Sequence, residues 1–167
     1  MLASLRTAFG QLACAGDFWS LRAVDERADS YAVRKNVAQP PSRTIDTGAM
    51  LTVYAGGGCG YAATNDLSRE GLQAALDRAT AWAQASARAS LIDFNTVARL
   101  APRGEYASPD LDRPGRSRRD WYELLGEESR QAGCDPRIVD WEASVETRAA
   151  EHLYLTSTGG DVLQRYR

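Results

Sequence analysis

Histidine is almost absent from this sequence, because His152 is the only one among 167 residues. Zinc sites take several ligands from His, Cys, Asp and Glu, and acid–base catalysis needs a partner within hydrogen-bond reach of the imidazole. Glu146 and Glu151 could approach His152 across a hairpin, but such a group on a solvated strand is common without function. We therefore expect a surface histidine, no self-sufficient hydrolase, and no catalytic, cofactor-binding or metal-binding residue in this chain.

An excess of charge of one sign and long apolar runs are also missing. The formal net charge is −2 and the pI is about 5.5, so no overall field attracts nucleic acid or an anionic membrane. No apolar run approaches the roughly 18 residues needed to span a bilayer. The first ten residues contain Arg6 and no long apolar stretch, which argues against a signal peptide. We expect a cytoplasmic protein with no membrane contact, and the charge argues against a nucleic-acid partner.

The sequence offers no framework of disulfides and no metal knuckle. Its three cysteines, Cys14, Cys59 and Cys134, are odd in number and far apart. This pattern is typical of free thiols in a reducing compartment.

Residues 1–98 carry the patterns of an α+β domain, in which an antiparallel sheet packs with helices. Apolar residues spaced by three and four predict a short helix that starts at Leu2 and stops near Gly16. Alternating residues predict strands over 18–27, 30–37, 48–55 and 59–64, and a long alanine-rich helix is expected over 68–90. Between the last two strands, Gly56-Gly57-Gly58 predicts a hairpin loop.

Residues 99–117 change character, since prolines and glycines stand among charges as in a linker or long loop. Ser117 can cap a helix over 118–132, which Gly133 ends. Alternation then predicts strands over 139–148, 151–157 and 162–167. We expect residues 118–167 to be a helix plus the first strands of a second, truncated β-rich domain, so that the chain is part of a longer protein.

The glycine run from Gly56 to Gly60 superficially suggests a phosphate loop. Phosphate loops join a strand to a helix whose N-terminus faces the anion, whereas these glycines join two strands and no Lys-Ser/Thr follows. A hairpin turn is the better interpretation. Cys59 as a nucleophile would need a neighbouring base, and the sequence places none beside it.

Two charged groups could also suggest function. The first is a basic cluster with aromatic neighbours, which could bind nucleic acid, but acidic residues surround it and a solvated helix start is the better interpretation. It consists of Arg113, Arg116, Arg118, Arg119, Trp121 and Tyr122. The second group is two carboxylate pairs that could serve as acid and base. They are Asp110 with Asp112 and Glu127 with Glu128, in polar stretches that offer no burial to shift a pKa.

One run is more specific than the rest. It reads Gly60-Tyr61-Ala62-Ala63-Thr64-Asn65-Asp66-Leu67-Ser68, after a strand that begins at Asp46-Thr47-Gly48 and before the alanine-rich helix. Together with the hairpin at Tyr154-Leu155-Thr156-Ser157-Thr158-Gly159-Gly160, it resembles the N-terminal part of the TldD/PmbA family, also called modulators of DNA gyrase. The family's strand commonly reads Gly-Val-Gly-Val-Arg, whereas Gly48-Ala49-Met50-Leu51-Thr52 stands here, so the role of that arginine is not carried over.

The resemblance implies a zinc-dependent peptidase that acts on peptides or unfolded segments and assembles as a homo- or heterodimer around a chamber. The family's zinc site is a His-Glu-x-x-x-His helix in a C-terminal domain, where the histidines bind the metal and the glutamate serves as general base. That motif is missing here, so zinc is expected outside this chain. The resemblance leaves two alternatives open: a non-catalytic partner subunit, or a module that interacts with protein or nucleic acid.

Overall fold

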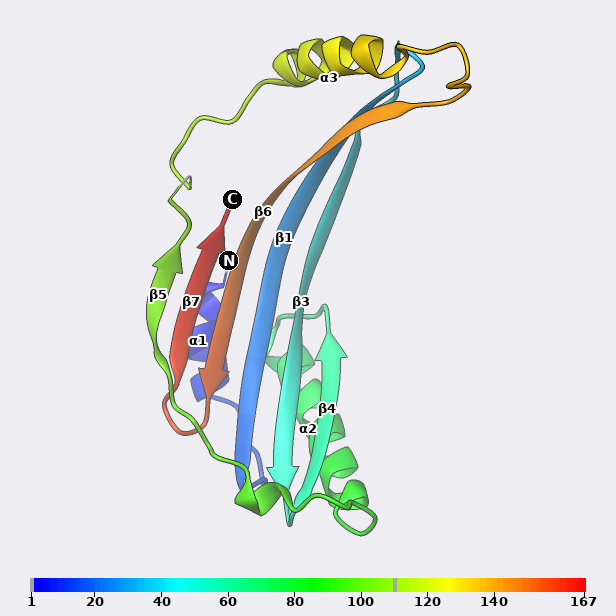
Figure 1. The fold of residues 1–167 in the computed structure, drawn as a ribbon. Coiled ribbons are helices and arrows are strands. Elements are labelled where there is room, and N and C mark those ends of the chain that lie inside the picture. Colours follow the sequence, from blue (N-terminus) through cyan, green and yellow to red (C-terminus); the bar gives the residue numbers. More distant parts are fainter. Residues whose placement is uncertain (1, 110) are drawn as a thin grey trace. The chain divides into compact units, whose positions relative to one another are not determined.

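The computed structural model describes residues 2–109 and 111–167 of the chain. Two compact units are present. Unit 1 consists of Met1–Asp25, Asp46–Ala107 and Ala150–Arg165, and unit 2 of Glu26–Ile45, Ser108–Ala149 and Tyr166–Arg167. The described residues form an α+β fold, as the sequence predicts (Figure 1).

Three α-helices, one short 3-10 helix and seven strands make up the described part of the chain. In chain order they are α1 (Ala3–Gly10), β1 (Phe18–Arg34), β2 (Val37–Ala38), β3 (Ser42–Ala55), β4 (Gly58–Thr64), α2 (Arg69–Ser86), η1 (Phe94–Thr96), β5 (Arg103–Ala107), α3 (Arg118–Ala132), β6 (Glu142–Thr156) and β7 (Asp161–Tyr166). The strand order is β4-β3-β1-β6-β7-β5, and β2 pairs with β1. The sheet is mixed, because β3 and β4 are antiparallel whereas β5 runs parallel to β7.

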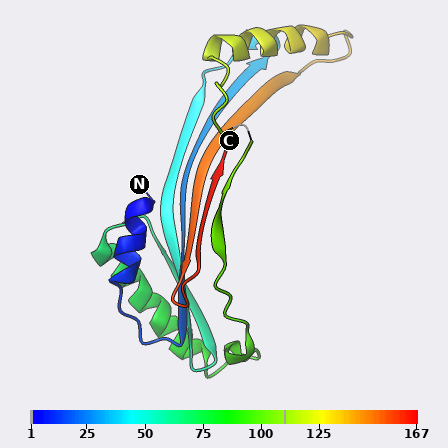
Figure 2. The same ribbon diagram turned by 90° about the vertical axis from the view of Figure 1, so that its left-hand side faces the viewer.

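In unit 1, α1 and α2 cover the same face of the strands (Figure 2). Leu21 of β1, Leu51 of β3 and Leu153 of β6 point into this layer and are fully buried in one cluster with Leu72 and Leu76 of α2. Because side chains alternate along a strand, the residues between these leucines face the other way. We call that second side of unit 1 the open face.

The long helix lies unusually close to β4. Ser68 caps its start by accepting a hydrogen bond from the Gly71 amide at 3.1 Å. A Cβ added at Gly58 would lie 2.1 Å from the carbonyl oxygen of Ala83, and one added at Gly60 would lie 2.2 Å from that of Ala79. The glycines of β4 therefore allow the helix backbone to touch the sheet.

The glycine hairpin is confirmed. Gly56 and Gly57 have φ of +57° and +84°, and Ala55 pairs with Gly58 across the turn. Two successive residues with positive φ define the turn that matches the right-handed twist of a two-residue hairpin.

Several expected boundaries were wrong. The strands expected over 18–27 and 30–37 are one strand, β1, since no glycine or proline interrupts them. The strands expected over 139–148 and 151–157 are likewise one strand, β6. The long helix ends at Ser86 and not near residue 90. The expected linker over 99–117 contains β5, which pairs with β7 from Arg103 to Ala107.

The described residues do not form the separate second β-rich domain that we expected from the sequence. β6 and β7 follow β1 in the same sheet, so the later strands extend the sheet of the first part. Each of β1, β3 and β6 contributes residues to both compact units. The domain limits at residues 98 and 117 stay a prediction.

Unit 2 is built around α3. A capping box starts this helix: Ser117 accepts from the Asp120 amide at 3.2 Å while the Asp120 carboxylate accepts from the Ser117 amide at 2.8 Å. The buried Ser129 of α3 accepts hydrogen bonds from the Asn36 amide at 3.1 Å and from the Trp141 indole at 3.2 Å. Leu125 and Val33 are the buried apolar residues of this unit.

Candidate functional site

His152 lies on β6, half-buried, and its side chain belongs to the open face because its neighbour Leu153 is in the core. No group of three or more His, Cys, Asp or Glu side chains that could hold a metal ion occurs among residues 2–109 and 111–167. These residues therefore do not fit the zinc site that the family resemblance implies.

The two carboxylates that could have approached His152 do not gather there. Glu146 and Glu151 both lie on β6, so no hairpin brings them together as the sequence suggested. Glu146 accepts a hydrogen bond from Arg148 at 2.7 Å, and Glu151 lies 3.4 Å from Arg165. Each carboxylate is thus paired with an arginine.

Cys59 follows the glycine turn on β4. Burial raises the pKa of its thiol, which keeps the sulfur protonated and poorly nucleophilic. Its amide donates to Ser86 Oγ at 3.0 Å, and the same hydroxyl donates back to the Cys59 carbonyl at 2.8 Å. The run therefore serves strand pairing and helix docking, in agreement with the hairpin interpretation.

Two arginines of the basic cluster at the start of α3 are engaged with residues of that helix. The Arg116 guanidinium lies 5.1 Å from the centre of the Trp121 ring, and Arg119 donates to Glu123 at 2.7 Å.

Glu127, from one of the two carboxylate pairs, is held by an arginine. A hydrogen bond from Arg130 holds the pKa of Glu127 below its usual value, which makes this residue a poor general acid. Of the other carboxylate pair, Asp110 lies outside the described residues.

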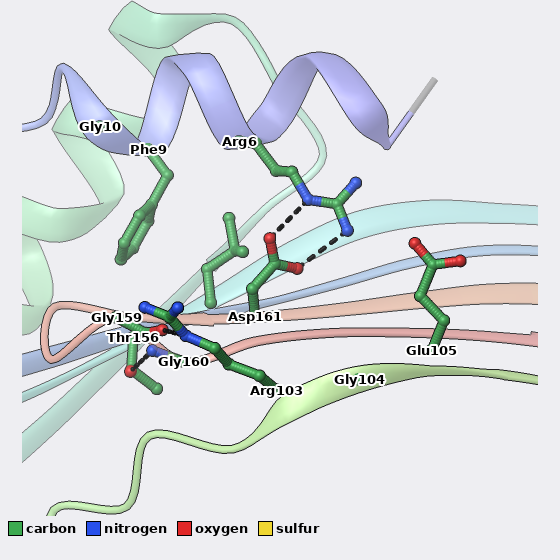
Figure 3. A pocket seen from close by; sticks show the side chains of 11 residues that line it. Arg6, Phe9, Gly10, Arg103, Gly104, Glu105, Thr156, Gly159, Gly160 and Asp161 are labelled. Atoms are coloured by element: carbon green, nitrogen blue, oxygen red, sulfur yellow. Dashed lines mark hydrogen bonds and ion pairs between the residues drawn. The ribbon is translucent and has the colours of Figure 1, made fainter.

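A cavity of about 560 Å³ lies beside α1, over the β6–β7 hairpin and β5 (Figure 3). Arg6 of α1 points into this cavity. It donates two hydrogen bonds of 2.8 Å to Asp161, from Nε to Oδ2 and from Nη2 to Oδ1. Arg103 donates from Nε to the Gly159 carbonyl at 2.7 Å. The hydrogen bond from Arg6 lowers the pKa of Asp161, so this carboxylate stays ionised and paired. The contact fixes α1 to β7.

Two further cavities adjoin Arg22 of β1. One, of about 270 Å³, is also lined by His152, Tyr154 and Gln164. The other, of about 580 Å³, is lined on the β3–β4 side by residues that include Met50. Arg22 lies between Leu21 and Ala23, both buried in the helix-covered layer, so its side chain points to the open face. Sequence analysis missed Arg22, although an arginine between two buried apolar residues of a strand was a visible signal.

None of the described helices is long and apolar enough to cross a membrane. No curated protein matches the sequence closely enough to count as a relative.

Several solved structures share the fold, among them these three. TldE from Thermococcus kodakarensis is 17% identical with a TM-score of 0.67, and the match covers 98% of this chain and 36% of that one. A putative modulator of DNA gyrase from Bacteroides thetaiotaomicron is 16% identical with a TM-score of 0.66, over 98% and 37% of the two chains. A putative modulator of a DNA gyrase from Thermotoga maritima is 12% identical with a TM-score of 0.60, and the match covers 89% of this chain and 33% of that one. The chain thus spans about a third of the length of these structures.

The sequence itself matches a known protein family. Residues 19–83, which run from β1 through β3 and β4 into α2, match PmbA/TldA metallopeptidase domain 1. Residues 19–83 thus match domain 1 of the PmbA/TldD family, and the fold of the described chain matches the N-terminal portion of the solved structures. The resemblance drawn from the run at Gly60 to Ser68 is therefore confirmed.

Proposed function

We propose that this chain is the non-catalytic N-terminal part of a zinc-dependent peptidase that acts in the cytoplasm on peptides or unfolded segments. The observation that carries the proposal is the match of residues 19–83 to domain 1 of a metallopeptidase family. The described residues offer no metal-binding group, so hydrolysis belongs to residues outside them. The role of this part is to supply a dimer surface and a wall of the substrate chamber.

Exposed apolar residues support the proposed dimer surface. In unit 2, Val37 is 62% exposed, Ile45 67% and Val139 77%. Large apolar side chains that stay in water favour association, because covering them removes apolar area from solvent. The partner in this proposal is a second subunit of the same family, identical or different.

The experiment is proteolysis by the intact protein with and without zinc. Unfolded casein should be cleaved, a zinc chelator should abolish the cleavage, and added zinc should restore it. The reading frame beyond Arg167 should encode two histidines one helical turn apart. A continuation with neither this helix nor a remnant of it would overturn the proposal, as would a zinc-loaded protein that cleaves no peptide.

A non-catalytic partner subunit is the nearest alternative, and the same continuation separates the two. A degenerate zinc helix, with one of its histidines replaced, would favour the partner subunit. Two of the similar structures carry the name putative modulator of a DNA gyrase, and a module that interacts with protein or nucleic acid is therefore a second alternative for this chain. A DNA-binding assay tests this for the present chain: affinity that does not change with salt would exclude a phosphate-neutralising surface.

A further inference from the structure

Arg22 differs from most arginines of this chain in its surroundings. Many of them are held by a carboxylate within the chain. These are Arg6, Arg27, Arg34, Arg43, Arg69, Arg119, Arg130, Arg137, Arg148 and Arg165. Within residues 2–109 and 111–167, no carboxylate forms a salt bridge with Arg22, and the guanidinium is exposed on the open face. It is therefore available for an anion from outside.

The groups around Arg22 can all donate hydrogen bonds. Tyr154, Gln164 and His152 line the smaller cavity with it, and a phenol, an amide and an imidazole each carry a donor. Alternation places these three side chains on the same face as Arg22, because Leu153 and Leu163 between them are in the core. Arg22 and three further side chains that can donate thus line one cavity of about 270 Å³, which has room for one acidic group and not for a whole ligand.

The larger cavity on the other side of Arg22 has a different character. Val24, Met50 and Ala63 supply apolar surface there, and Asp46 carries a negative charge at its lining. The Asp46 carboxylate repels a second anion, so an anionic group is favoured on the His152 side of Arg22. An apolar segment attached to that group can then lie toward Met50, across the strands.

We propose that Arg22 binds a carboxylate of an extended peptide that lies across the open face, with Tyr154, Gln164 and His152 as further donors. This inference rests on the proposed function and specifies which wall of the chamber holds the peptide and through which chemical group. The guanidinium fork matches the two oxygens of a carboxylate, which a lysine ammonium cannot do equally well. A free C-terminus and an acidic side chain present the same chemistry.

Binding of short apolar peptides to the intact protein tests the proposal. Three N-terminally blocked peptides are compared: one with a free C-terminal carboxylate, its C-terminal amide, and the amide with one internal aspartate. The carboxylate peptide should bind about tenfold more tightly than the amide, since one charge-assisted pair is gained. The aspartate peptide tells whether the site accepts a side-chain carboxylate or only a chain end. A photo-crosslinking group beside the carboxylate should attach to β1, β6 or β7.

Two variants locate the effect. Arg22→Gln should remove the preference for the carboxylate while leaving affinity for the amide unchanged, and Arg22→Lys should restore part of it. Arg165→Gln is the matched control, because it removes the same charge from β7. Arg165 lies two positions after the core residue Leu163, so its side chain is on the face away from Arg22.

Equal loss in Arg22→Gln and Arg165→Gln, or equal binding of all three peptides by the unmodified protein, would overturn the site while leaving the peptidase proposal intact. Failure of every peptide to bind would overturn both.

Discussion

At the scale of single residues, Gly60 decides how closely α2 can approach the sheet. An added Cβ would meet the Ala79 carbonyl oxygen at 2.2 Å and the Ala83 amide nitrogen at 2.3 Å, which are backbone atoms that cannot turn aside. The helix would have to move as a whole, and its buried alanines and leucines would lose contact with the strands. The glycine is therefore a packing requirement within strand β4.

We predict that Gly60→Ala lowers the free energy of unfolding by about 1–3 kcal/mol, the usual cost of inserting volume into a packed core. Gly10→Ala is the matched control: nothing lies within 4 Å of its added Cβ, at the last residue of α1. That variant should be neutral or gain up to about 1 kcal/mol, because alanine is the better helix former. Urea unfolding followed by circular dichroism measures both. Equal midpoints for the two variants would refute the packing argument.

At the scale of elements, one buried hydroxyl ties α3 to the β1–β2 turn. Ser129 Oγ accepts from the Asn36 amide and the Trp141 indole, and donates to the Asn36 side-chain oxygen at 3.0 Å. Asn36 itself has φ of +63°, and Lys35 before it has φ of +49°. A side chain that holds Asn36 thus supports a turn that contains no glycine.

Ser129→Ala should therefore lower the free energy of unfolding by about 0.5–1.5 kcal/mol, because the buried hydroxyl is lost and the donors of the exposed Asn36 and the partly buried Trp141 lose their acceptor. Ser144→Ala, at an exposed position of β6, is the control and should change stability by no more than about 0.5 kcal/mol. Tryptophan fluorescence during urea unfolding gives both values. A Ser129→Ala variant as stable as its control would show that the network contributes nothing.

The same elements show what could be predicted from sequence and what could not. The turn at Gly56-Gly57 and the helix after Ser68 were predictable, because glycine pairs and capping serines act locally. The turn at Lys35-Asn36 was missed because its stabilising partner, Ser129, lies far along the chain. β5 was missed because its five residues are all exposed and carry no alternation, and its pairing with β7 is non-local. The contact of Arg6 with Asp161 was also missed, because these two residues lie far apart in the sequence.

At the scale of the whole molecule, the two compact units differ in how much they bury. Unit 1 contains nearly all of the described apolar core, whereas unit 2 buries only Val33, Leu125 and Ser129 among its described residues. A unit with so small a core opens locally at low free energy, because few apolar contacts are lost on opening. The exposed Val37, Ile45 and Val139 belong to this same unit.

Hydrogen exchange at the amides should reveal this difference. Amides of β3 from Ala49 to Ala55, in unit 1, should exchange slowly, while those of α3 should exchange faster by at least about tenfold. If unit 2 supplies the proposed dimer surface, raising the protein concentration should slow exchange in α3 and around Val37 and leave the Ala49–Ala55 segment unchanged, since association stabilises only what it covers. Uniform protection across both units would contradict the first expectation. Exchange in unit 2 that is independent of concentration, in a protein shown by sedimentation to dimerise over that range, would place the dimer surface elsewhere.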